Sequence, residues 1–190
     1  YYQRHWRQYR ITRSGKFYKT YHLQKNYSHV LVLGEVKLLE NKFSSVFAFW
    51  PTSFINTKYT FKEKNHLETR KHFLYLGSTG AVHKGLDLLV DVFSKREDIV
   101  LHLCGLMEIE RKELRLPKRK NIIEYGHINL RSDIFLELID KCSYVILLSC
   151  SEGCSSSITS GMLHGLVPIV MRGAGFNRLG DNAIFLDDFK

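Results

Sequence analysis

Short apolar runs alternate with helix-patterned segments along most of this chain, and that alternation limits the folds open to it. Six runs of four or five residues occupy positions 73–76, 99–103, 122–125, 144–148, 166–170 and 183–186. Strands that are apolar on both faces and separated by helices are typical of a parallel sheet covered on both sides. We therefore predict a doubly wound α/β domain over residues 71–190, whose ligands bind at the carboxyl ends of the strands.

The helix-patterned segments carry apolar residues on one face. Leu86, Leu89, Val90 and Phe93 recur at helical spacing after the first run. A second stripe lies between the third and fourth runs and consists of Ile134, Leu138 and Ile139, and Ser132 precedes it as the expected N-cap. Both stripes predict helices that pack on the sheet.

Two loops of small residues each follow an apolar run and lead into a helix-patterned segment. The first loop is residues 77–85 (GSTGAVHKG), and the second loop is residues 149–157 (SCSEGCSSS). Free backbone N–H groups at a helix N-terminus attract anions, so the pair predicts a site for a phosphorylated ligand. Taken singly, each loop is more typical of an ordinary turn than of a phosphate site, and Lys84 is more typical of a solvated surface lysine.

Four segments occur in an order that matches a known family. They read FLYLG at 73–77, HKGLDLL at 83–89, SCSEG at 149–153 and GLVPIV at 165–170. In this order and spacing they resemble the carboxyl-terminal half of the group 1 (GT4-like) glycosyltransferases of GT-B fold. The resemblance covers residues 71–175 and implies a Rossmann-like, nucleotide-sugar donor-binding domain.

Carried over position by position, the resemblance implies roles for particular residues. Lys84 matches the lysine that contacts the donor pyrophosphate, and Glu152 matches the first of two glutamates, beside the donor sugar. These two are the expected catalytic residues. The expected phosphate-binding residues are Ser78, Gly80, Lys84, Gly153, Ser155, Ser156 and Ser157, and those expected at the ribose and base are Ser160, His127 and Ile128. A cation together with a helix N-terminus suits a diphosphate.

Two positions depart from the family pattern. Ser160 stands where relatives carry the second glutamate, which binds the ribose, and Ser78 stands where an arginine usually follows the strand. A serine lacks the bidentate geometry of a carboxylate, so the ribose contact is expected to be weaker. For the missing arginine, the expected compensation comes from the backbone amides of residues 78–81.

The amino-terminal part is expected to belong to another domain. We predict that residues 1–60 are the end of an acceptor domain with a linker, and residues 61–190 the donor-binding domain. Buried strands are expected at residues 29–34 and 46–51, followed by a polar connector at 52–70. Since a GT-B enzyme has two complete domains, this 190-residue chain is expected to be incomplete and inactive alone.

The chain carries a net charge of +9, and some of its basic residues gather in two clusters. One begins with Arg4, Arg7, Arg10 and Arg13, and the other spans residues 111–120. Two interpretations stay open: a solvated face, or a surface that meets anionic lipid headgroups, where each cation contributes roughly 1 kcal/mol. The aromatic residues follow strand patterns rather than a recognition motif, so no nucleic-acid partner is expected.

Four cysteines, Cys104, Cys142, Cys150 and Cys154, lack the paired spacing of a zinc site and suit reduced thiols. No apolar run approaches the ~18 residues that a membrane-spanning helix needs. A cytoplasmic location is therefore expected, with peripheral membrane contact if the basic surface meets lipid headgroups.

The resemblance implies a retaining, metal-independent glycosyltransferase of the hexosyltransferase type. It would transfer a sugar from a nucleotide-sugar donor, with no cofactor, to a saccharide or lipid-linked acceptor in cell-surface polysaccharide or glycolipid synthesis. Two alternatives stay open: a nucleotide-sugar epimerase of the same fold, and a degenerate, non-catalytic nucleotide-sugar-binding domain. The donor sugar, its nucleotide and the acceptor are not specified by these residues.

Overall fold

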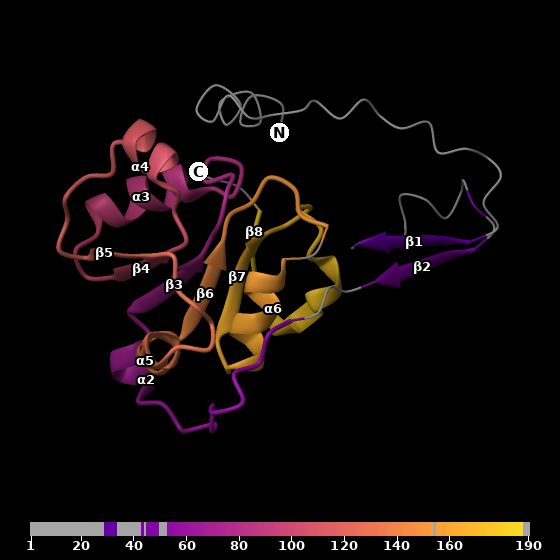
Figure 1. Ribbon diagram of the computed structural model, residues 1–190, viewed down its shortest axis with the longest axis horizontal. Helices are drawn as coiled ribbons and strands as arrows, with labels where there is room; N and C mark the ends of the chain where they lie inside the picture. The colour runs from indigo at the N-terminus through magenta and orange to yellow at the C-terminus, as the bar shows by residue number, and fades with distance from the viewer. Residues whose placement is uncertain (1–28, 34–42, 44, 50–52, 154, 188–190) are drawn as a thin grey trace.

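The computed structural model describes residues 29–33, 43, 45–49, 53–153 and 155–187. Strands β1 (Val30–Leu33) and β2 (Val46–Phe49) form a small parallel sheet that projects from the rest of the described chain (Figure 1). Both strands fall where they were expected. They are not buried within the described chain, because Leu31 is 75% and Phe47 52% exposed. The basic cluster that begins at Arg4, and Cys154, lie outside the described residues.

The main sheet has six parallel strands, as the apolar runs predict. They are β3 (His72–Leu76), β4 (Val100–Cys104), β5 (Ile122–Gly126), β6 (Tyr144–Leu147), β7 (Val167–Met171) and β8 (Ile184–Leu186). Their order in the sheet is β5-β4-β3-β6-β7-β8, and all neighbours run parallel. The order reverses between β3 and β6, so the carboxyl ends of these two strands form the switch point at which such sheets bind ligands.

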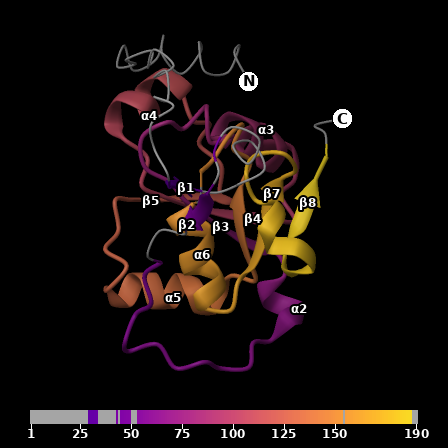
Figure 2. The ribbon, with the colours of Figure 1, turned by 90° about the vertical axis from the view of Figure 1, so that its right-hand side faces the viewer.

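Helices cover both faces of this sheet, which confirms the doubly wound α/β fold. Figure 2 shows α3 (Leu86–Lys95) and α4 (Glu108–Leu114) on one face, and α5 (Asp133–Lys141) and α6 (Ser156–Leu163) on the other. A short helix, α2 (His66–Thr69), precedes β3, and a 3-10 helix, η2 (Asn177–Asn182), precedes β8.

Local sequence explains where these helices begin and what they bury. In α3, the expected stripe supplies the buried residues Leu86, Leu89 and Phe93. At the start of α5, the Ser132 side chain accepts a hydrogen bond from the backbone N–H of Phe135, as predicted for an N-cap. In α5, Leu138 and Ile139 are buried as the stripe predicts, but Ile134 is 50% exposed. The helices therefore place most of their apolar residues on the sheet and leave the strand ends accessible.

The polar connector before β3 packs along α6. The backbone N–H of Asn56 donates to Nε2 of His164 at 3.0 Å, and the Tyr59 hydroxyl donates to the His164 carbonyl at 2.8 Å. His164 is buried, and its Nδ1 lies 2.7 Å from the Ser160 carbonyl. The connector and α6 thus form one packed unit. Among the described residues, no helix is long and apolar enough to cross a bilayer.

Candidate functional site

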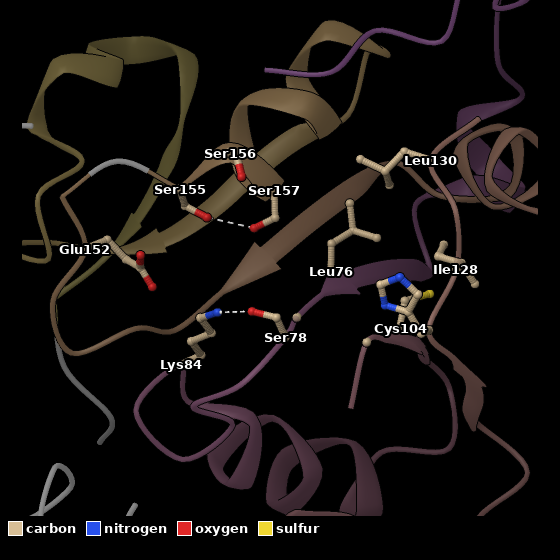
Figure 3. Close-up of a pocket in the computed structure, with 13 residues that line it drawn as sticks. Leu76, Ser78, Lys84, Cys104, Ile128, Leu130, Glu152, Ser155, Ser156 and Ser157 are labelled. Atoms are coloured by element: carbon tan, nitrogen blue, oxygen red, sulfur yellow. Dashed lines mark hydrogen bonds between the residues drawn. The ribbon is translucent and has the colours of Figure 1, made fainter. Parts of the chain in front are cut away.

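A cavity of about 310 Å³ opens at the carboxyl ends of β3, β4 and β6, at the switch point of the sheet (Figure 3). Its lining divides into two halves. One half is polar and carries Ser78, Lys84, Glu152 and the serines that begin α6. The other half is mainly apolar and is lined by Leu76, Cys104, Ile128 and Leu130, with His127 beside them. The arrangement suits a ligand that has a charged end and a flat, less polar end.

The first loop brings Lys84 to the polar half. At the end of this loop, Gly85 has φ +76°, and a Cβ atom there would lie 2.2 Å from the Leu148 carbonyl oxygen. Only glycine therefore allows the loop to turn into α3 so close to the end of β6. From the preceding position, Lys84 extends into the cavity, where its Nζ donates to Oγ of Ser78 at 2.9 Å (Figure 3).

The backbone amides at the turn of the first loop have an internal partner. The N–H groups of Gly80 and Ala81 both donate to Oε1 of Glu110, at 2.9 Å each. Glu110 lies in the first turn of α4 and is 0% exposed. These amides were expected to compensate for the missing arginine. At Gly80 and Ala81 the structure contradicts that expectation, because a buried carboxylate already accepts both N–H groups and Gly80 does not line the cavity. For the amides of Ser78 and Thr79 the expectation stays a prediction.

The second loop holds Glu152 at the opposite wall. The Glu152 backbone N–H donates to the Ala174 carbonyl at 2.6 Å. Gly175 has φ +97°, and a Cβ atom there would lie 2.0 Å from the Glu152 carbonyl oxygen. The Glu152 carboxylate turns towards the cavity (Figure 3), and its buried Oε1 atom has no hydrogen-bond partner among the described residues. This oxygen is positioned to accept a hydrogen bond from a ligand.

The amino terminus of α6 closes the polar half. Ser155 is the N-cap residue, yet its side chain makes no capping hydrogen bond; its Oγ lies 2.7 Å from Oγ of Ser157. The first turn of α6 contains no acidic residue. Within the part of the chain that the structure describes, nothing accepts a hydrogen bond from the backbone N–H of Ser156 or Ser157. Two oriented donors and the positive end of a helix dipole therefore face the cavity.

The two loops are joined to each other. The backbone N–H of Cys150 donates to the His83 carbonyl at 3.0 Å, and Nε2 of His83 lies 2.9 Å from the Ser151 carbonyl oxygen. A shift of one loop therefore disturbs the other. Lys84, which follows His83, and Glu152, which follows Ser151, take their positions from this shared frame.

The cavity contains eight of the eleven residues predicted from the sequence: Ser78, Lys84, His127, Ile128, Glu152, Ser155, Ser156 and Ser157. Gly80, Gly153 and Ser160 do not line it. Ser160 is 1% exposed, and its Oγ accepts a hydrogen bond at 3.0 Å from the Phe54 backbone N–H in the polar connector. The structure thus places Ser160 against the connector and away from the site predicted for the ribose.

Five lining residues were not identified from the sequence: Leu76, Gly77, Cys104, Gly105 and Leu130. Four of them stand at or just after the ends of β3 and β4, which is the signal that would have found them. Burial raises the pKa of the Cys104 thiol to about 12, so this side chain is a neutral, apolar part of the wall. The described residues contain no group of three or more His, Cys, Asp or Glu side chains placed to hold a metal ion.

The basic cluster at residues 111–120 lies apart from this cavity. It lines a separate groove beside the edge strand β5 and shares no residue with the cavity lining. Within that groove, Nε of Arg111 pairs with Glu124 at 2.8 Å. The cluster is therefore not a part of the candidate site.

No protein-family model and no curated protein matches this chain. Solved structures do match. TarM is 18% identical, with a TM-score of 0.62 over 84% of this chain and 33% of TarM. A point mutant of TarM from S. aureus, solved with UDP, fondaparinux and α-GlcNAc-glycerol, also matches. HepE from Anabaena, solved with UDP and glucose, is 16% identical, with a TM-score of 0.62 over 86% of this chain and 50% of HepE. Sucrose-phosphate synthase from Thermosynechococcus elongatus is also 16% identical, with a TM-score of 0.62 over 87% of this chain and 47% of the synthase. The chain thus spans a third to a half of the structures it matches.

Proposed function

Because this chain has the α/β Rossmann-like fold of the GT-B glycosyltransferases, we propose that its cavity binds the nucleotide-sugar donor of a glycosyltransferase. One observation carries the proposal. The Lys84 ammonium and the open N–H groups of α6 face the same cavity from two different loops. A point cation and a helix N-terminus together suit the two phosphates of a nucleoside diphosphate.

The polar half would act on the leaving group. When the bond between the sugar and the diphosphate breaks, negative charge accumulates on the phosphate oxygen. Lys84 and the N–H groups of Ser156 and Ser157 are already oriented towards that charge, so they stabilise it without rearrangement. We propose that these groups steady the diphosphate in a metal-independent transfer with retention at the anomeric carbon.

Glu152 would position the donor sugar. Its buried Oε1 has no hydrogen-bond partner among the described residues and faces the cavity beside the diphosphate groups. A carboxylate accepts hydrogen bonds only, so a sugar hydroxyl is a suitable donor to it. The contact would hold the sugar over its own diphosphate.

The apolar half would receive the base. Cys104, Ile128 and Leu130 offer an apolar surface next to His127, and a flat base packs well on such a wall. The UDP in the TarM and HepE crystal structures makes uridine diphosphate the first ligand to test. We propose that the saccharide acceptor binds opposite this cavity; that the chain is incomplete and inactive alone stays a prediction. A lipid-linked acceptor, a role in polysaccharide or glycolipid synthesis, the cytoplasmic location and the membrane contact stay predictions.

Calorimetric titration of this chain with UDP, GDP, ADP and dTDP tests the proposal. We expect at least one diphosphate to bind, and to bind at least tenfold more weakly to Lys84→Ala, as loss of a charge-assisted contact implies. The lysine at position 95, exposed and paired with Asp91, supplies the matched control Lys95→Ala. If none of the four binds at millimolar concentration to the folded chain, the cavity is not a donor site.

A further inference from the structure

The first loop contains a contact that the donor site itself does not use. Glu110 reaches the loop from α4, 30 positions further along the chain, and Oε1 accepts the N–H groups of Gly80 and Ala81 at 2.9 Å each. Two successive backbone N–H groups that converge on one oxygen form the kind of nest that binds anions. Here the anion is a side chain of the protein.

This contact ties the loop to α4. Glu110 is fully buried, so the hydrogen bonds that it receives from the protein replace those that water would supply. Moving the loop away would leave a buried carboxylate without two of its donors, which is costly. The backbone of Gly80 and Ala81 is therefore held firmly at this point.

The same two residues also hold the segment that carries the cation. The carbonyl of Gly80 accepts the N–H of Lys84 at 2.8 Å, and the carbonyl of Ala81 accepts the N–H of Leu86 at 2.9 Å. Each of the two residues thus binds Glu110 through its N–H group and, through its carbonyl, the segment from Lys84 to Leu86 that leads into α3. A continuous hydrogen-bonded path leads from the Glu110 carboxylate to the backbone of Lys84.

We propose that Glu110 is a positioning residue, which fixes the first loop and thereby sets the Lys84 ammonium in the cavity. The proposal rests on the proposed function, because its effect on affinity requires a diphosphate bound by Lys84. It also reassigns the amides of Gly80 and Ala81: they bind an internal carboxylate, and the diphosphate is left to Lys84 and the start of α6.

A double-mutant cycle tests the proposal, with UDP affinity measured by calorimetry on Glu110→Gln, Lys84→Ala and the double variant. Glutamine keeps the shape and one acceptor oxygen but removes the charge. We expect Glu110→Gln to weaken UDP binding about fivefold alone, and less than about twofold in the Lys84→Ala background, because coupled residues are not additive. Glu113→Gln, an exposed glutamate on the same helix, is the matched control.

Two outcomes of the cycle overturn the proposal. Equal losses of affinity in both backgrounds would show that Glu110 supports the fold without acting through Lys84. Tighter UDP binding by Glu110→Gln would show that Glu110 competes with phosphate for the amides of Gly80 and Ala81.

Amide hydrogen exchange supplies a second test that needs no ligand. We expect the amides of Gly80, Ala81 and Lys84 to exchange about tenfold faster in Glu110→Gln, since charged acceptors hold their donors more strongly, while the amides of β4 keep their protection. Unchanged exchange at these three amides would overturn the proposal, whether or not UDP binds. Failure of UDP to bind would by itself overturn only the proposed function. If Glu110→Gln does not fold, NMR spectra of the unaltered chain test the proposal instead. We expect UDP to shift the amide signals of Ser156 and Ser157 and to leave those of Gly80 and Ala81 unchanged; shifts at Gly80 and Ala81 would overturn it.

Discussion

The two loops that form the polar half of the cavity are alike in sequence and opposite in electrostatic state. In the first loop, the amides of Gly80 and Ala81 already bind the carboxylate of Glu110. In the second loop, α6 begins without an acidic residue, and no described residue accepts the N–H of Ser156 or Ser157. The first loop already binds an anion from another part of the chain, and the second is open to an external one.

This difference teaches that loop composition alone does not identify a phosphate site. Both loops are rich in small residues, and both stand between a strand and a helix. What separates them is a residue outside both, Glu110 on α4. In the proposed function, the first loop therefore contributes the Lys84 side chain to the diphosphate, whereas the second contributes the backbone at the start of α6, with the Glu152 side chain for the sugar.

The largest expected effect comes from breaking the second loop with Gly175→Ala. The new Cβ atom would lie 2.0 Å from the Glu152 carbonyl oxygen, at a φ of +97°. We expect the free energy of unfolding to fall by about 3 kcal/mol, from overpacking and backbone strain together. Gly173→Ala is the matched control, with φ +77° and nothing within 4 Å of the new atom, and should lose only about 1 kcal/mol. Equal losses in urea denaturation would show that the close contact with Glu152 does not constrain the loop.

Removal of the cation of the first loop, by Lys84→Ala, should have the next largest effect. A charge-assisted contact contributes about 1.5 to 3 kcal/mol, so UDP affinity should fall roughly ten- to hundredfold. The melting temperature should stay unchanged, because the only hydrogen bond of the Lys84 side chain among the described residues is to the exposed Ser78. Unaltered affinity in the folded variant would exclude Lys84 from the site.

The sequence predicts those parts of the fold and of the site that depend on residues close together along the chain. Apolar runs, helical stripes and the Ser132 cap depend on neighbours along the chain, and the structure contains the strands, helices and cap that they predict. The positions of Lys84 and Glu152 in the cavity follow from the strand ends that precede their loops.

Contacts between distant residues account for what the sequence does not predict. The partner of Gly80 lies 30 positions away, and the hydrogen bond between Phe54 and Ser160 joins residues 106 positions apart. Neither contact leaves a local pattern. Each depends on how the helices pack after the sheet has formed, and each removes an expected ligand contact from the cavity.

Acid should destabilise the strands on the β4 side of the main sheet, next to the first loop, more than β6, β7 and β8, next to the second. In β4, Nε2 of His102 lies 2.9 Å from Nδ1 of His72, and Nδ1 of His102 lies 3.0 Å from the Tyr125 hydroxyl oxygen. Strands β6, β7 and β8 contain no histidine. Burial, followed by the neighbouring His72, lowers the pKa of His102 to about 4.

The unfolded chain therefore binds a proton at this position between about pH 6.5 and 4 that the folded chain does not bind. The free energy of unfolding is fully retained above that range and should fall by about 2 kcal/mol between pH 7 and 5 through His102 alone. Urea denaturation across this range should show a smaller loss in His102→Gln. An identical pH dependence in the two proteins would mean that the folded His102 titrates normally.

Making the second loop resemble the first is the next test. Ser156→Asp places a carboxylate at the first position of α6, where it interacts favourably with the helix dipole by about 0.5 kcal/mol. The same charge opposes a diphosphate, so UDP affinity should fall about tenfold while the melting temperature rises slightly. Ser151→Asp adds the same charge at an exposed position of the second loop that does not line the cavity. Equal losses in both variants would indicate a diffuse charge effect, and α6 would then not be the anion site.

The smallest effect should come from Ser78→Ala, which removes the one hydrogen bond partner of the Lys84 ammonium among the described residues. The charge of Lys84 remains, and an exposed neutral hydrogen bond contributes little, so UDP affinity should fall only about twofold. Ser78→Arg adds a second cation at the same position and should tighten UDP binding several-fold, with a steeper dependence on salt. A tenfold loss in Ser78→Ala would mean that the serine hydroxyl contacts the ligand directly. The first loop would then supply two side chains to the site, and its contrast with the backbone donors of the second loop would be sharper still.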